Sequence, residues 1–310
     1  MNHLDLFSGI GGFSLGIRQA GIEPSWIGYS EIDKYANNIF RRHFSEAEKL
    51  GGIESIQPRD LPRLDLVTFG FPCQDISIAG NRGGLESSRS GLFFEAMRII
   101  RAKRPKYIIF ENVKGLFSSN EGYDFIVCLQ QIADSGYDGQ WQLLNTRWFL
   151  PQNRERVYFV GHLRGECRPE VFPIGEVSQG DNEIEFQGQA SNINGERRED
   201  FEGGWGCSLH PVEVRPVLSS HQKQNGRHIK GHNEDMFTLN THNDCGIVEG
   251  TNIRRLTPTE CERLQGFPDG WTKDQSDTQR YKQLGNAVSV PVVKEVIKKM
   301  SFLKKMTGYL

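Results

Sequence analysis

The sequence lacks the features that mark membrane and secreted proteins. None of its apolar runs approaches the roughly 20 residues that a membrane-spanning helix needs. The first residues show no basic stretch followed by an apolar one, so no secretory signal is expected. A chain of 310 residues is long enough to bury a large core and to add a smaller second unit. We therefore expect a cytoplasmic protein that makes no contact with a membrane.

Cysteine is scarce and scattered. Six cysteines, at positions 73, 128, 167, 207, 245 and 261, do not form a disulfide framework in a chain of this length. In a reducing compartment the thiol of Cys73 stays available for chemistry. The set Cys207, His210, His242 and Cys245 offers four zinc-type ligands, but the spacer between its two pairs is about twice as long as in usual zinc modules. The zinc site stays open as an alternative, and no metal is assigned.

The sequence also lacks a strong excess of charge. A formal net charge of −2 does not indicate a nucleic-acid-binding protein. The charges are nevertheless segregated, because residues 181–202 hold seven acidic side chains against two arginines. Residues 205–232 hold four basic side chains against one acid, with four histidines besides. A nearly neutral chain with this distribution can still present a basic face.

Glycines separate the first predicted strand, residues 3–7, from an amphipathic helix that ends before Gly21. Gly9 and Gly11 would let the backbone approach a ligand closely. The spacing is not G-x-G-x-x-G, so a nicotinamide cofactor is disfavoured. A second strand, residues 26–30, ends at Glu31, where such folds hold a ribose hydroxyl. A plain turn and a surface acid are the alternatives for these two features.

Two further apolar strands end at reactive side chains. Residues 64–69 read as a buried strand that is stopped before Cys73, and residues 107–110 lead directly to Glu111. Because the carboxyl ends of such strands share one edge of a sheet, a thiol and a carboxyl group would meet there. A carboxyl group that leaves an apolar strand is easily desolvated, which suits it to donating a proton. Considered alone, each residue could also be an ordinary core cysteine or a surface acid.

Arginines accompany these strand ends. The eighteen-residue loop 74–91 contains four glycines, four serines, Arg82 and Arg89, a composition that suits mobility and contacts with phosphate. Arg154 and Arg156 lie two residues apart before a predicted strand at residues 157–160. On an extended segment they would point the same way and hold one polar group together. Solvated surface arginines are the alternative.

The remaining pattern predicts helices at 33–43, 92–103 and 124–134, a weak strand near 53–56 and a strand near 141–146. From residue 165 to about 251 the apolar periodicity fades, which indicates a loop-rich domain with strands at 212–218, 236–239 and 246–248. Thr257, Pro258 and Glu260 form the capping box of a new helix. A polar turn at 283–288 precedes an apolar helix from 292 to about 300. That helix needs the first domain's sheet to cover, so we divide the chain into 1–164, 165–252 and a return segment, 253–310.

Six short blocks occur in the order that one family uses. They are DLFSGIGG at 5–12, GFPCQ at 70–74, ENV at 111–113, QNRER at 152–156, RLT to GFP at 255–268, and GN at 285–286. With these blocks the chain resembles the DNA (cytosine-5)-methyltransferases of bacterial or phage type. The resemblance spans residues 4–293 and implies an α/β fold. That fold would combine a Rossmann-like, S-adenosylmethionine-dependent methyltransferase domain with a small, loop-rich target-recognition domain.

The resemblance implies a role for each block. Cys73 would attack carbon 6 of a flipped-out cytosine, and Glu111 would protonate or hydrogen-bond its N3. Arg156 would hold the carbonyl oxygen of the base, with Arg154 beside it. Contacts with S-adenosyl-L-methionine are implied for Phe7, Gly9, Ile10, Gly11, Glu31, Ile32, Ile53, Gly70, Pro72, Asn286 and Val288. Contacts with DNA are expected for Gln74, Ser77, Arg89, Arg215, Arg227, Thr238 and Leu239.

Two positions depart from the family pattern. Ile32 stands where the family often has a tryptophan that stacks on adenine, and an isoleucine can only pack. Gly52 stands where the family has an acid near the adenine amino group. Asp60 is one candidate to replace that acid, and a less specific hold on adenine is the alternative.

The expected partner is double-stranded DNA, bound by a monomer. In a restriction-modification system a cognate endonuclease would be a further partner. Transfer-RNA cytosine methylation is the main rival activity, and the long variable stretch with Thr238 and Leu239 favours DNA. A catalytically silent homologue is disfavoured because Cys73, Glu111 and both arginines are present.

Overall fold

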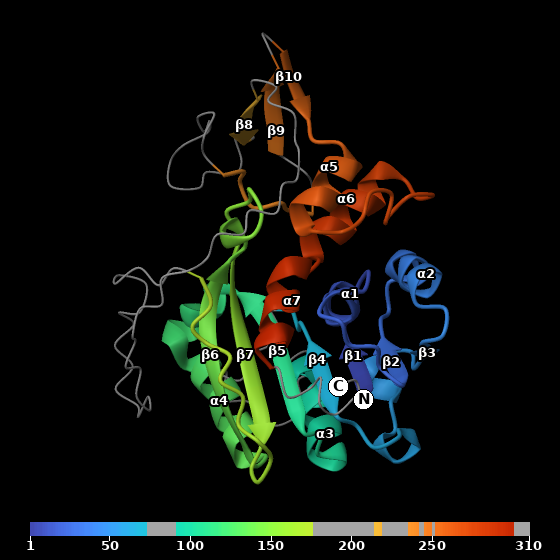
Figure 1. The fold of residues 1–310 in the computed structure, drawn as a ribbon, viewed down its shortest axis with the longest axis vertical. Coiled ribbons are helices and arrows are strands. Elements are labelled where there is room, and N and C mark those ends of the chain that lie inside the picture. The colour runs from blue at the N-terminus through green and yellow to red at the C-terminus, as the bar shows by residue number, and fades with distance from the viewer. Residues whose placement is uncertain (73–90, 176–213, 219–234, 242–244, 250–251, 301–310) are drawn as a thin grey trace.

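The computed structural model describes residues 1–72, 91–175, 214–218, 235–241, 245–249 and 252–300 (Figure 1). Its centre is a seven-stranded sheet with the order β3-β2-β1-β4-β5-β7-β6. The strands are β1 (Asn2–Leu6), β2 (Trp26–Ser30), β3 (Glu48–Lys49), β4 (Leu66–Phe69), β5 (Tyr107–Val113), β6 (Tyr137–Asn145) and β7 (Glu155–Leu163). The first five are parallel, and β7 runs antiparallel to both β5 and β6. The predicted α/β class is confirmed.

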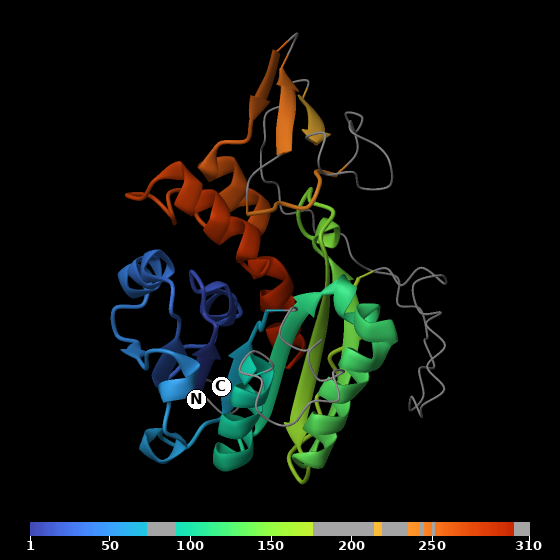
Figure 2. The same ribbon diagram turned by 180° about the vertical axis from the view of Figure 1, so that it is seen from behind.

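Helices cover both faces of this sheet. On one face lie α3 (Gly91–Lys103) and α4 (Tyr123–Asp134), and on the other lie α1 (Gly12–Gln19) and α7 (Val290–Lys299) (Figures 1 and 2). Strand residues alternate between the two cores: Phe110 joins the α3/α4 side, whereas the preceding Ile109 joins the α1/α7 side. Burying such a side chain contributes about 1.5–3 kcal/mol. The strands are therefore apolar on both faces, and polar side chains collect at their ends.

The apolar C-terminal helix returns to the first sheet, as predicted. It packs so closely on α1 that a Cβ atom at Gly16 would lie 2.5 Å from Cγ1 of Val293. Two further helices, α5 (Pro258–Gln265) and α6 (Asp277–Asn286), precede it, and α2 (Lys34–His43) flanks β2. The chain that leaves the large sheet after β7 thus closes the core begun by its first helix.

A second, antiparallel sheet of three strands lies beyond α5 and α6 (Figure 1). Its strands are β8 (Val214–Leu218), β9 (Cys245–Glu249) and β10 (Asn252–Arg255). The capping box that starts α5 is confirmed, because the Glu260 N–H donates to the Thr257 hydroxyl (3.2 Å). In return, the Thr257 N–H donates to the Glu260 carboxylate (2.7 Å). The domain limits 1–164, 165–252 and 253–310 stay predictions.

Three local predictions are wrong. Residues 53–56 are not a strand, because residues 53–55 form a 3-10 helix, η1 (Ile53–Ser55), whose turn is closed by the Ser55 N–H and hydroxyl on the Gly52 carbonyl (3.0 and 2.7 Å). Residues 236–239 make only one bridge, from Met236 to Gln152. Residues 283–286 complete α6 instead of forming a turn. At residues 53–56, hydrogen bonds from the distant Arg98 to the Ile53 and Ile56 carbonyls add to the local turn.

Within the described part of the chain, no helix combines the length and the apolar character that crossing a membrane requires.

Candidate active site

A carboxylate and a guanidinium meet at the end of β5. Glu111 lies opposite Tyr158 of β7, and Arg156 lies opposite Val113, so both side chains project from the same face as diagonal neighbours. The Nε atom of Arg156 is 3.1 Å from Oε1 of Glu111, and the two side chains are 15% and 11% exposed. Two strands that are distant in sequence thus build a nearly buried ion pair at the sheet edge.

The electrostatics of Glu111 favour a proton donor. Burial raises the pKa of its carboxyl group above the ordinary value, although the positive charges of Arg156 and Arg154 act in the opposite direction. Its Oε1 atom has no hydrogen-bond partner among the described residues, even though the Arg156 charge is close. The carboxyl group therefore retains hydrogen-bonding capacity for a ligand.

The segment that leads to Cys73 is held beside Glu111. The amide of Asn112 donates to the Phe71 carbonyl (2.9 Å), and a Cβ atom at Gly70 would lie 3.5 Å from Oε2 of Glu111. Asn112 is only 3% exposed. It was not assigned to the site from the sequence, although a buried amide at the end of an apolar strand is a recognisable signal. We infer that Asn112 fixes the approach of this segment to Glu111.

Several predicted site residues lie outside the described residues. These are Cys73, Gln74, Ser77 and Arg89 of the loop after β4, and Arg227 of the variable stretch. Arg215 lies on β8, of which only the backbone is described. Their roles stay predictions.

Arg154 has a different environment from Arg156. It precedes the first residue of β7 and is 2% exposed. Its guanidinium donates to the carbonyls of Ala287 (2.9 Å), Gly285 (3.2 Å) and Leu239 (3.3 Å). Burial lowers its pKa to about 9, which still leaves it charged at neutral pH. The two arginines therefore have separate hydrogen-bond and ion-pair partners, and Arg154 joins the segment 235–241 to the end of α6.

Where the segment 235–241 meets the end of α6, there is no room for a side chain at position 285. A Cβ atom there would lie 2.4 Å from the carbonyl carbon of Asn240 and 2.6 Å from the Thr241 nitrogen. Beside it, the Thr238 hydroxyl donates to the Asn153 carbonyl (2.5 Å), and Leu239 is 3% exposed within the core. Leu239 therefore packs inside the protein in this structure. The predicted contacts of Leu239 and Thr238 with DNA stay predictions.

The glycine loop after β1 adopts the backbone that glycine favours. The φ angles of Phe7, Gly9 and Gly11 are 55°, 54° and 88°, all in the left-handed region. The Gly9 N–H donates to one oxygen of Glu31 (2.9 Å), and the other oxygen accepts from the Asp33 N–H (2.8 Å). Glu31 therefore holds the loop against the end of β2.

The surroundings of this loop fit a nucleoside cofactor. A Cβ atom at Gly9 would meet no described atom within 4 Å, and Ile32 next to Glu31 is 83% exposed. Val288 packs on the other side of the loop, 2.5 Å from where a Cβ atom of Gly12 would lie, and Asn286 is exposed. An open glycine loop, an acid at the end of β2 and a free apolar side chain are the groups that such a ligand needs.

Buried polar side chains of β1, β4 and α1 form a chain of hydrogen bonds next to the glycine loop. The Thr68 and Ser14 hydroxyls donate to the Asp5 carboxylate (3.0 and 2.7 Å), and the Thr68 hydroxyl also contacts Nε2 of His3 (2.8 Å). Burial raises the pKa of Asp5 to about 7 and lowers that of His3 to about 3. These residues were not singled out from the sequence, because their contacts join β1 to β4 and α1.

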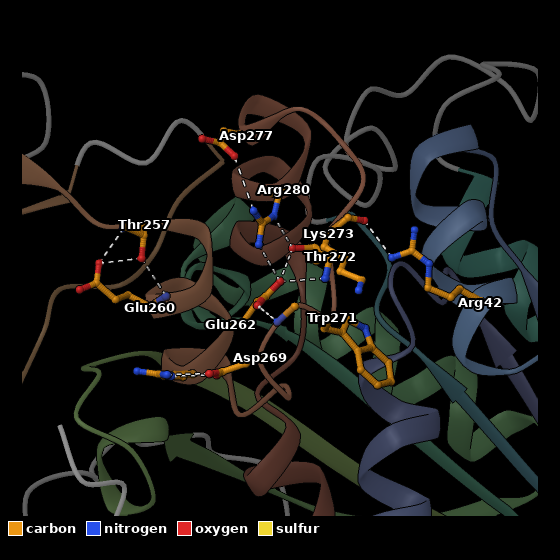
Figure 3. A network of polar contacts seen from close by, with 12 residues as sticks. Arg42, Thr257, Glu260, Glu262, Asp269, Trp271, Thr272, Lys273, Asp277 and Arg280 are labelled. Atoms are coloured by element: carbon orange, nitrogen blue, oxygen red, sulfur yellow. Dashed lines mark hydrogen bonds and ion pairs between the residues drawn. The ribbon is translucent and has the colours of Figure 1, made fainter.

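A second buried acid ties α5 and α6 to the glycine loop (Figure 3). Glu262 is fully buried and accepts hydrogen bonds from the N–H groups of Gly270 (2.6 Å) and Thr272 (2.8 Å) and from Arg280 (3.2 Å). The turn that it holds presents Trp271, whose indole N–H donates to the Ile10 carbonyl (3.0 Å). The C-terminal return segment thus contributes directly to the position of the loop.

Metal ligands are not clustered in the described part of the chain, where no group of three or more histidine, cysteine or acidic side chains could hold an ion. Of the four zinc-type ligands in the sequence, Cys207, His210 and His242 lie outside the described residues, and only the backbone of Cys245 is described.

Comparisons with known proteins agree with this arrangement. The family model described as C-5 cytosine-specific DNA methylase matches residues 1–301. The type II methyltransferase M.NlaX of Neisseria lactamica is 34% identical over 316 residues, which cover 96% of this chain and 95% of the relative. M.NgoBI of Neisseria gonorrhoeae, also a type II methyltransferase, is 34% identical over 310 residues, with coverage of 97% and 93%.

The fold is also similar to a solved structure, that of the Dnmt2 methyltransferase from S. pombe. The TM-score is 0.65 at 22% sequence identity, and the match covers 100% of both chains. The family match extends from the glycine loop through the Glu111–Arg156 pair to α7, so it includes every described part of the site. The chain belongs to the C-5 cytosine-specific DNA methylases and is a DNA (cytosine-5) methyltransferase.

Proposed function

We propose that the protein transfers a methyl group from S-adenosyl-L-methionine to carbon 5 of a cytosine that is flipped out of a specific double-stranded DNA sequence, through a covalent adduct with Cys73. The observation that carries this proposal is the buried Glu111–Arg156 pair beside the segment that leads to Cys73. Carbon 5 of cytosine is a weak nucleophile, so electrons must first be added to the ring.

The Cys73 thiolate supplies those electrons by attacking carbon 6. Glu111 donates a proton to N3 as negative charge develops on the ring, a role supported by its raised pKa. Arg156 holds the carbonyl oxygen of the base. S-adenosyl-L-methionine supplies the electrophilic methyl group. After transfer, a base removes the carbon 5 proton and N3 returns its proton to Glu111. Elimination then breaks the sulfur–carbon 6 bond, which restores the ring and releases Cys73 as a thiolate.

Arg154 acts on the cofactor side of the site and does not hold the base itself. Its hydrogen bonds to the Gly285 and Ala287 carbonyls support a role in holding Asn286 and Val288 beside the glycine loop. Cofactor binding further involves Phe7, Gly9, Ile10 and Gly11 of that loop, Glu31 and Ile32 after β2, and Ile53, Gly70 and Pro72 after β3 and β4.

The loop 74–91 would assist the flipping of the target base out of the duplex. A base inside a duplex is unreachable, and extruding it costs roughly a few kcal/mol. Contacts of Gln74, Ser77 and Arg89 with DNA offset part of that cost, and Arg215, Arg227, Thr238 and Leu239 contribute to recognition. If Arg89→Ala left DNA affinity and turnover unchanged, this role of the loop would be wrong.

The biological setting is inferred from the relatives. M.NlaX and M.NgoBI are both named type II methyltransferases, which supports assigning this enzyme to a restriction-modification system. A monomeric state and partnership with a cognate endonuclease are further parts of the proposal. The division into a catalytic part, 1–164, a recognition domain, 165–252, and a return segment, 253–310, belongs to the same proposal.

One experiment tests the reaction. The protein is incubated with S-adenosyl-L-methionine and mixed double-stranded DNA, and the products are sequenced for 5-methylcytosine. Methylation at one short motif is expected, and Cys73→Ala should abolish it while leaving DNA binding largely intact. Methylation of RNA alone, or full activity of Cys73→Ala, would overturn the proposal.

A further inference from the structure

Gly52, which stands where the family has an acid near the adenine amino group, lies next to the acidic residue Glu54. A Cβ atom at Gly52 would be 3.2 Å from Oε2 of Glu54 and 3.6 Å from Cγ2 of Ile32. The space that a side chain at position 52 would enter is therefore bordered by the Glu54 carboxylate on one side and by an apolar methyl group on the other. The Glu54 carboxylate therefore lies close to where an acidic side chain at position 52 would lie, although it comes from a residue two positions later in the sequence.

Asp60, the replacement considered from the sequence, does not share this location. It ends the 3-10 helix η2 (Pro58–Asp60), its side chain is 71% exposed, and its nearest ionic partner is the adjacent Arg59 at 3.7 Å. No described contact joins Asp60 to Gly52 or Ile32. Asp60 thus lacks the contacts that Glu54 makes.

The turn that carries Glu54 is firmly held. Ile53 is 3% exposed, and the Ser55 N–H and hydroxyl both donate to the Gly52 carbonyl. From α3, Arg98 donates to the carbonyls of Ile53 (3.2 Å) and Ile56 (3.0 Å). The backbone at Glu54 is therefore fixed, so only the exposed side chain of Glu54 has to be ordered when a ligand binds.

The sheet order places this carboxylate in line with the glycine loop. Strands β1, β2 and β3 are consecutive neighbours, and their carboxyl ends present the loop, then Glu31, then the turn with Glu54. The Ser30 hydroxyl joins the last two by donating to the Gly51 carbonyl (2.8 Å). If Glu31 binds the ribose, the attached base extends one strand further, toward Ile32 and Glu54.

We propose that Glu54 selects adenine: its carboxylate accepts a hydrogen bond from the 6-amino group while the ring packs on Ile32. An ionised carboxylate only accepts hydrogen bonds, so it matches an amino group and repels a carbonyl oxygen at the same ring position. This inference rests on the proposed use of S-adenosyl-L-methionine and adds the residue that distinguishes its base.

The test measures binding by calorimetry on the full chain without DNA. The ligands are S-adenosyl-L-homocysteine and its hypoxanthine analogue, which carries an oxygen in place of the 6-amino group. The wild type should prefer the adenine ligand by about tenfold or more, the scale of one hydrogen bond to a charged group. Glu54→Ala should weaken adenine binding by about tenfold and strengthen binding of the analogue, because it removes both the hydrogen bond to the amino group and the repulsion of the oxygen. Glu54→Gln, whose amide can accept or donate, should bind both ligands about equally.

Two further variants separate the possible failures. Asp60→Ala, a matched exposed acid, should keep the adenine preference, and Glu31→Ala should weaken both ligands by the same factor. If Glu54→Ala retained the preference, or Asp60→Ala removed it, Glu54 would not be the selecting residue, although the proposed reaction would stand. If the wild type bound neither ligand, the proposed cofactor would fail, and the role of Glu54 with it.

Discussion

Replacing Arg154 or Arg156 by methionine should impair different properties of the protein. Methionine keeps the apolar stem of the side chain and removes the guanidinium group. Arg154→Met deletes three hydrogen bonds from a side chain that is 2% exposed. Arg156→Met deletes one ion pair with Glu111 at the edge of the site and one hydrogen bond to the Glu155 carbonyl (2.7 Å). We expect the first variant to lose stability and the second to lose catalysis.

The magnitude is set by the contacts of Arg154. A hydrogen bond to a charged group contributes about 1.5–3 kcal/mol, and the bonds of 3.2 and 3.3 Å belong at the low end of that range. Their simultaneous loss leaves buried carbonyls unpaired, so the expected cost is about 3–5 kcal/mol, as for other broken buried charge interactions. A typical total stability is only about 5–15 kcal/mol.

Arg156→Met should cost less, about 1–2 kcal/mol, because the Glu111 carboxyl left behind can bind a proton and become neutral. Its pKa is already raised by burial, and loss of the Arg156 charge raises that pKa further. Cytosine methylation should nevertheless fall steeply, because the group that holds the base is gone.

Urea unfolding followed by tryptophan fluorescence measures the first effect, and methylation of DNA by the folded variants measures the second. The expected result is a strongly lowered midpoint with an unchanged slope for Arg154→Met, and a smaller decrease of the midpoint for Arg156→Met. A wild-type midpoint for Arg154→Met, or a greater destabilisation in Arg156→Met, would refute this assignment of the two arginines.

Three other substitutions test separate parts of the structure. Gly285→Ala should destabilise by about 2 kcal/mol or more in urea unfolding, because its Cβ would lie 2.4 Å from the Asn240 backbone; Gly115→Ala, whose Cβ would lie 3.8 Å from Cγ2 of Val113, an ordinary contact distance, serves as a control for the added methyl group. Since burial raises the pKa of Asp5 to about 7, its stabilisation is complete below pH 3.8 and is lost as the pH rises through 7. The unfolding free energy of Asp5→Asn minus that of wild type should therefore rise by about 1.4 kcal/mol per pH unit between pH 4 and 7, and a difference independent of pH would contradict this. Glu262→Ala should weaken binding of S-adenosyl-L-homocysteine in calorimetry, because it releases the turn that carries Trp271; unchanged affinity would show that the turn does not control the loop.

Features with a local cause could be predicted from the sequence. The capping box of Thr257 and Glu260 depends on residues three apart, and the structure contains both of its hydrogen bonds. The strand that carries Glu111 and the loop around Gly9 depend on short apolar runs and on glycine. Both begin where they were expected, although the strand continues past residue 110 to Val113. The α/β class results from the order of such elements along the chain.

Features that depend on distant partners could not be predicted in this way. The apolar spacing of Ile53 and Ile56 suggested a strand, but Arg98 and the Gly52 carbonyl stabilise a 3-10 turn. Residues 236–239 have the composition of a strand, yet their neighbours are Arg154, Gly285 and a short segment before β7 rather than a full partner strand.

The family, the fold class and the residue types at the strand ends follow from the order of amino acids alone, because they depend on motifs and on local periodicity. Which of those residues act together depends on contacts that form only in the folded chain. Arg154 and Arg156 are two positions apart, but they lie in different environments because the carbonyls that bind Arg154 come from segments 85 to 133 residues away. Glu54 and Asp60 are both acids after β3, and the position of the Glu54 carboxylate beside Gly52 distinguishes them. Side chains acquire separate roles when the folded chain brings different partners to them.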